Sequence, residues 1–504
     1  RAVPGQLHAQ PAEAAAKRVY MFGQNAWGQL ARGSTASCPV TTTCASGSAE
    51  WRNVLRPEEW VEVPAAKQRD ASSKPVVCPP EALSSALHGA PQQFRDPRLS
   101  LGATWTLMLD GGELSAAGWA GDGACGFAPS VTTRGMCGEH VVAMRQVAER
   151  WLEAPSMGHT ETFGSFKHLS RHFPTPLKPQ REAFSTELAH CGFGKRSHPL
   201  RFADVSTAYT SSMLLSDDGR CAFVVGLAPD APTMHLTLPQ AAIRDHRIVQ
   251  PVPIFWAGAW RTRSSVRSVV NTYSKNFLLL EDGSVLQSHT PPPNAVDTLS
   301  TWEVLHFPDG ARVRKLAGYD WACYLALAED GHLFAWREEH GCKMCIPWGP
   351  AQRHSSMRTV LTDVADFGAG TRHVLAVKAD GTLWTAGQDE CGMLGYAIDG
   401  AHGSVFSFAH VPGRSDWKAV CAGMYYSMAL TTEGRLFVWG SLAARGEWDC
   451  EDGGARIFEA PTPVEEAFGL EVAPWTAAGE RIESIDCGYY HAAIVTASRP
   501  SPQQ

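Results

Sequence analysis

Residues 370–395 read "GTRHVLAVKADGTLWTAGQDECGMLG". An unbroken apolar run at residues 374–377 predicts a short strand that is covered on both faces. Asp380 and Gly381 then supply turn chemistry, because glycine adopts a positive φ without steric cost. Residues 382–386 are mostly β-branched, apolar or aromatic, which is typical of a returning strand. The segment therefore predicts a β-hairpin that needs a neighbouring sheet on each side.

Five further segments repeat this order of apolar run, acidic-glycine turn and second apolar run. The six turn glycines are Gly111, Gly219, Gly283, Gly331, Gly381 and Gly434, and the last four intervals are 64, 48, 50 and 53 residues. One hairpin about every fifty residues is typical of a propeller blade. We predict blade hairpins near residues 105–119, 210–226, 273–288, 321–336, 373–387 and 426–440.

A seventh unit is divided between the two ends of the sequence. Residues 482–498 contain Gly488-x-x-His491, which matches Gly370-x-x-His373, but no Asp-Gly turn follows. The missing half stands at residues 17–33. Sharing one blade between both ends hides the edge strands at the seam of a ring. The sequence therefore predicts an all-β fold over residues 1–504, a single seven-bladed β-propeller in which Ile494 pairs beside Tyr20.

These repeats resemble the regulator of chromosome condensation repeat family. The shared features are a small-Gly step, a His three residues after the glycine, the Asp-Gly turn and a Trp-Gly step, the last at Trp439-Gly440. The small-Gly steps are Ala317-Gly318, Ala369-Gly370, Ala422-Gly423 and Cys487-Gly488. The His position holds Trp321 in one repeat and Tyr426 in another. The resemblance implies a seven-bladed propeller and permits guanine-nucleotide exchange on a small GTPase without a cofactor. No exchange residues can be mapped onto this chain.

The chain is longer than seven blades require. Blades of about 50 residues account for about 350 of the 504 residues. We place the surplus in insertions at about residues 34–92 and 124–200, with short helices around residues 140–153. Insertions in repeat proteins often bind a partner, and the alternative is loop growth without a separate role.

Composition narrows the partners and the compartment. The net charge is −7, from 44 basic and 51 acidic residues, which disfavours nucleic-acid binding through a broad positive surface. RNA contact is expected only within an assembly. No apolar stretch reaches 18 residues, so no membrane insertion is expected. The first acidic residue is Glu13, which is consistent with the remainder of an organellar transit peptide.

Two groups among the 14 cysteines bear on the redox compartment and on metal binding. Cys221, Cys323, Cys421 and Cys487 lie in or beside apolar strand patterns, which indicates buried small hydrophobic residues and a reducing compartment. Cys342 and Cys345 have the spacing of half a zinc site, and Cys391 is a conceivable partner. Two free thiols in a connecting loop are the favoured interpretation.

The sequence offers no catalytic constellation. His373 and His491 lie at the structural His position, where hydrogen bonds between neighbouring blades are expected. No nucleophile elbow or phosphate loop is present. We therefore expect no catalytic, cofactor-binding or metal-binding residues and no cofactor.

Three functions follow, from different classes. The first is a non-catalytic scaffold that binds protein subunits of a large organellar (mitochondrial) complex such as the mitochondrial ribosome, as a subunit or assembly factor. The second is an exchange factor for a small GTPase. The third is an enzyme or metal protein with an insertion over the central channel. Cytoplasmic or nuclear localisation is the alternative to the mitochondrial one.

Overall fold

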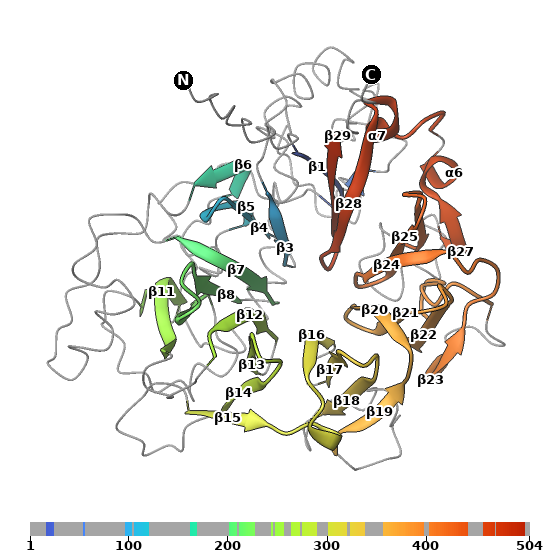
Figure 1. Ribbon diagram of the computed structural model, residues 1–504. Coiled ribbons are helices and arrows are strands. Elements are labelled where there is room, and N and C mark those ends of the chain that lie inside the picture. The colour runs from blue at the N-terminus through green and yellow to red at the C-terminus, as the bar shows by residue number, and fades with distance from the viewer. Residues whose placement is uncertain are drawn as a thin grey trace, which may run out of the picture.

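Seven antiparallel sheets stand around a central axis in the computed structural model (Figure 1). This confirms the seven-bladed β-propeller. The structure describes residues 17–24, 54–55, 96–102, 105–119, 162–168, 201–208, 211–226, 243–244, 247–256, 264–272, 275–289, 301–319, 323–337, 356–397, 403–441, 457–468 and 470–498.

The first three blades come from the half of the chain in which the repeats are least regular. Blade 1 contains β3 (Arg98–Leu101), β4 (Trp105–Asp110), β5 (Glu113–Trp119) and β6 (Thr162–His168). Blade 2 has five strands, β7 (Phe202–Thr207), β8 (Ser211–Ser216), β9 (Cys221–Gly226), β11 (Arg247–Trp256) and the outermost β10 (Ile243–Arg244). Blade 3 contains β12 (Val266–Asn271), β13 (Asn276–Leu280), β14 (Val285–His289) and β15 (Thr301–Leu305).

Blades 4 to 6 come from the most regular repeats. Blade 4 contains β16 (Val313–Tyr319), β17 (Cys323–Ala328), β18 (Leu333–Arg337) and β19 (Arg358–Leu361). Blade 5 contains β20 (Val364–Ala369), β21 (His373–Lys378), β22 (Leu383–Gln388) and β23 (Ser404–His410). Blade 6 contains β24 (Trp417–Ala422), β25 (Tyr426–Thr431), β26 (Leu436–Gly440) and β27 (Phe458–Pro463), and α6 (Val464–Phe468) and α7 (Pro474–Ala477) follow it.

The seventh blade joins the two ends of the chain. Its order is β28 (Glu480–Cys487), β29 (His491–Ser498), β1 (Lys17–Gln24) and β2 (Val54–Leu55). Strand β1 runs antiparallel to β29, with Tyr20 opposite Ile494. The predicted closure of the ring is therefore confirmed, and we call this sheet the closing blade.

The two central strands of each regular blade are buried on both faces, as the sequence predicts. Strand β21 has five buried residues followed by a partly exposed Lys378. All six turn glycines have positive φ, from 56° at Gly111 to 88° at Gly331. In four turns the aspartate accepts a hydrogen bond from the backbone N–H two residues later, as in Asp380 Oδ1 with Thr382 N at 2.9 Å. These aspartates therefore shape the turns.

Both predicted insertions contain an outermost strand. Strand β2 lies within residues 34–92, and β6 lies within residues 124–200. Each insertion thus divides into two connections, one that enters the outer strand and one that leads to the next blade. The helices expected around residues 140–153 lie outside the described residues.

One predicted equivalence is wrong. Residue Cys323, not Trp321, begins the second strand of blade 4, and it lies opposite Arg337 as His373 lies opposite Gly387. The Gly-x-x-His spacing misses this position because Gly318 stands five residues before Cys323, whereas Gly370 stands three residues before His373. Tyr426 lies opposite Gly440, so its assignment to the His position is confirmed.

Candidate functional site

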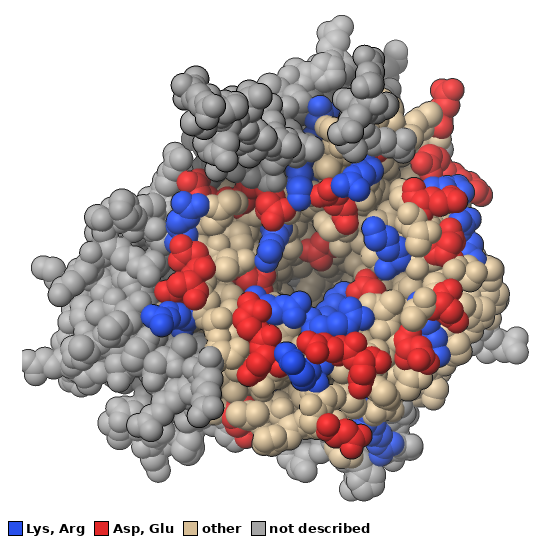
Figure 2. All heavy atoms as spheres, in the orientation of Figure 1, with Lys and Arg blue, Asp and Glu red and all other residues tan. Residues whose placement is uncertain are grey.

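The innermost strands of the seven blades surround the axis of the ring. Lys, Arg, Asp and Glu side chains gather around a hollow there (Figure 2). We call these seven strands the inner strands; they are β3, β7, β12, β16, β20, β24 and β28. Only one edge of each inner strand is paired within its own blade, so the other edge presents free N–H and C=O groups.

Side chains from the preceding blade satisfy part of these free edges. The Asp204 carboxylate accepts hydrogen bonds from Val269 N at 2.9 Å and Ser268 Oγ at 2.7 Å. In the same way Asp366 accepts Val420 N at 3.2 Å. The sequences around these residues, Phe-Ala-Asp-Val and Val-Ala-Asp-Phe, are near repeats. That repetition is the signal from which this role could have been found.

Serine hydroxyls make the equivalent contact near the end of two inner strands. Ser100 Oγ accepts a hydrogen bond from Thr207 N at 2.9 Å, and Ser206 Oγ accepts one from Asn271 N at 2.9 Å. The donor in each case is the last residue of the next inner strand, and the acceptor is the next-to-last residue of its own. A single geometric rule therefore links blade 1 to blade 2 and blade 2 to blade 3.

Basic side chains contact the carbonyl groups of the same edges. Lys315 Nζ donates to Phe367 O at 2.6 Å and to the Asp366 carboxylate at 2.7 Å. Arg314 donates to Ala365 O at 2.6 Å. These cations of blade 4 are thus engaged with blade 5.

The His position makes a second kind of contact between blades. His373 Nε2 lies 2.6 Å from Ser427 Oγ, and His491 Nε2 lies 2.8 Å from Thr106 Oγ1. Trp105 has the equivalent place in blade 1 and donates from Nε1 to Ser212 Oγ at 3.3 Å. In all three cases the first residue of the second strand contacts the second residue of the next blade's second strand. The predicted structural role of both histidines is therefore confirmed.

Burial controls the titration of these groups. Complete desolvation lowers the pKa of His373 and of His491 to about 3, so both imidazoles are neutral at physiological pH. Because Ser427 Oγ donates to Met393 O at 2.8 Å, it accepts the proton on His373 Nε2. A buried neutral imidazole without a carboxylate partner suits a structural tie better than proton transfer.

One inner-strand carboxylate, that of Asp486 in β28, has few compensating contacts. Asp486 accepts a hydrogen bond from the adjacent Cys487 N at 3.0 Å. Burial raises the pKa of Asp486 to about 7, and the charge of Lys315 opposes this shift. Desolvation also raises the pKa of Asp204, although its two hydrogen bonds act in the opposite direction.

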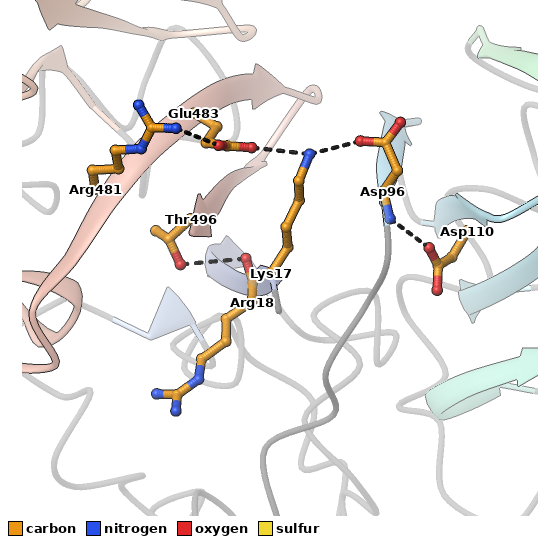
Figure 3. Close-up of polar contacts among 7 residues, drawn as sticks. All are labelled: Lys17, Arg18, Asp96, Asp110, Arg481, Glu483 and Thr496. Atoms are coloured by element: carbon orange, nitrogen blue, oxygen red, sulfur yellow. Dashed lines mark hydrogen bonds and ion pairs between the residues drawn. The ribbon is translucent and has the colours of Figure 1, made fainter. Parts of the chain in front are cut away.

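The seam has its own polar contacts (Figure 3). Lys17 Nζ lies 2.7 Å from Asp96 Oδ1 and 2.9 Å from Glu483 Oε2, so it joins β1, β28 and the segment before β3. Hydrogen bonds to both carboxylates raise the pKa of Lys17. Within the closing blade, the carboxylate of buried Glu480 accepts hydrogen bonds from Tyr20 Oη at 3.0 Å and from Thr496 Oγ1 at 2.7 Å.

The cysteines differ from the sequence-based expectation. Cys421 and Cys487 form a disulfide between β24 and β28, with Cα atoms 5.6 Å apart. Cys221, Cys323 and Cys391 are also disulfide-bonded. Burial was predicted correctly for Cys221, Cys323 and Cys421, but their disulfide bonding was not expected. The cysteines therefore give no support for a reducing compartment, and Cys391 is not a free metal ligand.

Other candidate ligands do not form a metal site in the described part of the chain. No group of three or more His, Cys, Asp or Glu side chains there could hold a metal ion. Cys342 and Cys345 lie outside the described residues. Within the described residues no helix is long and apolar enough to cross a membrane.

All seven connections between third and fourth strands begin at the same end of the blades. Adjacent antiparallel strands place the first-to-second and third-to-fourth connections of a blade at one end, which we call the loop face. The third-to-fourth connections, each longer than ten residues, are residues 25–53, 120–161, 227–246 (which contain β10), 290–300, 338–357, 389–403 and 441–457. Connections of two to five residues usually suffice between such strands. The loop face is thus the candidate interaction surface.

The ring and its contacts define a seven-bladed β-propeller of the kind found in the regulator of chromosome condensation family. No family model matches the chain. Among solved structures it is similar to human WBSCR16 (TM-score 0.56, 16% identity, 96% of this chain and 100% of that chain). It is also similar to Prp20p, the yeast RCC1, from Saccharomyces cerevisiae (TM-score 0.58, 14% identity, 97% of this chain and 93% of that chain). At these identities the likeness shows the fold.

A curated relative shares part of the sequence. The chain is 29% identical over 155 residues to the secretion-regulating guanine nucleotide exchange factor of Bos taurus. The match covers 28% of this chain and spans only a third of the length of that relative, 33%. The resemblance expected from the repeats is therefore confirmed at the level of an RCC1-like propeller.

Proposed function

We propose that the protein is a non-catalytic scaffold that binds protein partners through its loop face. The observation that carries this proposal is the position of all seven third-to-fourth connections at one end of a closed ring. Loops on a rigid framework commonly carry recognition, and insertions in repeat proteins often line the binding face. The opposite ends of the regular blades have tight acidic-glycine turns that leave less chain for contact.

The chemistry of the interior supports this interpretation. The buried histidines are neutral and hydrogen-bonded to hydroxyl groups of the next blade. The inner-strand carboxylates Asp204 and Asp366 accept backbone N–H groups. Groups that could have served acid-base chemistry thus hold the ring together.

Cross-linking mass spectrometry on the native assembly tests the binding face. Lys275 lies in the first-to-second turn of blade 3, at the loop face. Lys343 belongs to the connection between β18 and β19 of blade 4, whose two ends lie at that face. Lys378 and Lys418 lie at the opposite end of their strands and serve as matched controls. We expect cross-links to partners from the first pair, and cross-links confined to the second pair would contradict the proposal.

We further propose that the partners belong to a large mitochondrial complex such as the mitochondrial ribosome. The support is the absence of acidic residues among residues 1–12 together with the scaffold character of the ring. Affinity purification from fractionated cells, followed by sedimentation, tests this. Co-migration with a large mitochondrial particle is expected. A free monomer in the cytosolic or nuclear fraction would contradict it.

Guanine-nucleotide exchange on a small GTPase is the second candidate. The match to the bovine exchange factor favours it, and Prp20p was analysed for its binding to Gsp1p and histones. Such a propeller would stabilise the nucleotide-free GTPase through surface contacts. Release of a fluorescent guanine nucleotide from a panel of small GTPases measures this activity. Accelerated release from one of them would favour exchange over the scaffold function.

A further inference from the structure

The boundary between blade 6 and the closing blade differs from the preceding boundaries. At each of the first five, a glycine in the second-to-third turn accepts a hydrogen bond from the first residue of the next inner strand. The five donor–acceptor pairs are Phe202–Gly112, Val266–Gly219, Val313–Gly283, Val364–Gly331 and Trp417–Gly381, at 2.9 to 3.1 Å between N and O. Within the described residues Gly434 O accepts no such bond, because α6 and α7 separate blade 6 from β28.

The packing around the second-to-third turn of blade 6 differs in the same way from the packing around that turn of blade 5. A Cβ atom added at Gly381 would lie 2.1 Å from Ser415 O, so blade 6 abuts that turn. A Cβ atom added at Gly434 would meet nothing within 4 Å. The closing blade therefore lacks the turn contact that holds its counterparts.

The Cys421–Cys487 disulfide occupies the place of a serine contact. Cys421 is the next-to-last residue of its inner strand, as Ser100 and Ser206 are. Cys487 is the last residue of the following inner strand, as Thr207 and Asn271 are. At this boundary a covalent bond replaces the hydroxyl–amide hydrogen bond that links blade 1 to blade 2 and blade 2 to blade 3.

We propose that this disulfide is a redox-controlled staple of the closing blade. A dithiol reductant of the thioredoxin type supplies two electrons and two protons. Its thiolate attacks the sulfur of Cys487, the less buried of the two residues, and Cys421 leaves as a thiolate that takes up a proton. The second thiol of the reductant then releases Cys487 as a thiol, and the reductant becomes a disulfide.

Reduction loosens this boundary without abolishing it. The disulfide closes a loop across a sequence separation of 66 residues that includes β25, β26 and β27 of blade 6. Tyr426 Oη still donates to His491 O at 2.6 Å, and Met424 N still donates to Tyr489 O at 2.9 Å. The closing blade contains both ends of the ring, so local opening there exposes β1, β28 and β29.

Hydrogen exchange with and without dithiothreitol tests the staple on the full chain. Reduction should accelerate exchange in β24, β28, β29 and β1 about tenfold or more, because a constraint on a long loop is removed. The double variant Cys421→Ser/Cys487→Ala should exchange at the fast rate under both conditions. Cysteine alkylation followed by peptide mass spectrometry establishes which state each sample is in.

A matched variant separates this effect from the general loosening of a blade boundary. Ser206→Ala removes the equivalent contact between blades 2 and 3 but leaves Cys421 and Cys487 intact, so it should keep the full redox response in the closing blade. Two results would overturn the proposal. One is an unchanged redox response in the double variant, and the other is free Cys421 and Cys487 thiols in protein isolated under oxidising conditions.

Discussion

Two successive blade boundaries are held together by different contacts. The first lies between blades 5 and 6, and the second lies between blade 6 and the closing blade. In the first, backbone meets backbone, since Trp417 N donates to Gly381 O at 3.1 Å and Gly370 approaches Gly423 O. In the second, a disulfide and the Tyr426 hydroxyl act beside the backbone hydrogen bond from Met424 N to Tyr489 O. Regular repeats can rely on close backbone packing, whereas a ring that ends beside its own beginning needs side chains to align the last blade.

The largest expected effect comes from obstructing the backbone contact. A Cβ atom at Gly370 would lie 2.2 Å from Gly423 O, which neither blade can move aside easily. We expect Gly370→Ala to lower the free energy of unfolding by about 4 kcal/mol. Chemical denaturation followed by tryptophan fluorescence measures it.

Gly434→Ala is the matched control for that substitution. Its φ of 84° makes alanine unfavourable, but no atom lies within 4 Å of the added Cβ. The loss should therefore be only about 1 kcal/mol. Equal losses at Gly370 and Gly434 would show that blade contact contributes little.

The same contrast explains how far the sequence could predict the structure. Blade number, hairpins and closure follow from local signals, the apolar runs and the acidic-glycine turns, which recur often enough to be counted. The outer strands were missed because β2 and β6 stand inside insertions and have no repeated signal of their own. Their pairing depends on the edge that the third strand offers.

Contacts between blades were harder to predict than the blades themselves. His373 and His491 could be assigned because the repeat marks their position. The roles of Asp204 and Ser206 depend on which face of one strand meets the edge of another, which single-sequence spacing does not specify. The Cys421–Cys487 pair was missed because the two residues occupy different positions in their repeats.

The second prediction concerns the histidine ties on acidification. The pKa of each buried imidazole is about 3, below the ordinary value of 6.5. The unfolded chain therefore binds more protons than the folded chain between these values, and stability is lost as pH falls from about 6.5 towards 3. We expect each histidine to account for about 2 kcal/mol between pH 7 and pH 5.

Single variants assign this loss to blade boundaries. His373→Gln should remove its share of the pH dependence at the boundary of blades 5 and 6, and His491→Gln should do so at the seam. Urea denaturation at several pH values measures the slope. An unchanged slope in both variants would mean that other groups cause the acid sensitivity.

The third prediction has the opposite sign. Because burial raises the pKa of Asp486 to about 7, the folded chain binds more protons than the unfolded chain between about pH 4 and 7. The stability that the protonated form provides is therefore lost as pH rises through this window. Asp486→Asn should stabilise the protein at pH 8 by up to about 4 kcal/mol, the limit set by the difference between a pKa of about 7 and the ordinary value of 3.8, with no effect at pH 4. A destabilised variant at pH 8 would show that the charged carboxylate has a favourable partner.

The smallest expected effect tests the hydroxyl contacts of the first blades. Ser206→Ala leaves Asn271 N without its acceptor at 2.9 Å, which should cost about 1 kcal/mol. Substitution of the exposed Ser265 by alanine is the control and should change stability by less than about 0.5 kcal/mol. If Ser206→Ala is also neutral, water in the central hollow replaces the hydroxyl. The serine contacts would then set alignment without adding stability, and the covalent bond at the closing blade would be the stronger restraint by a wide margin.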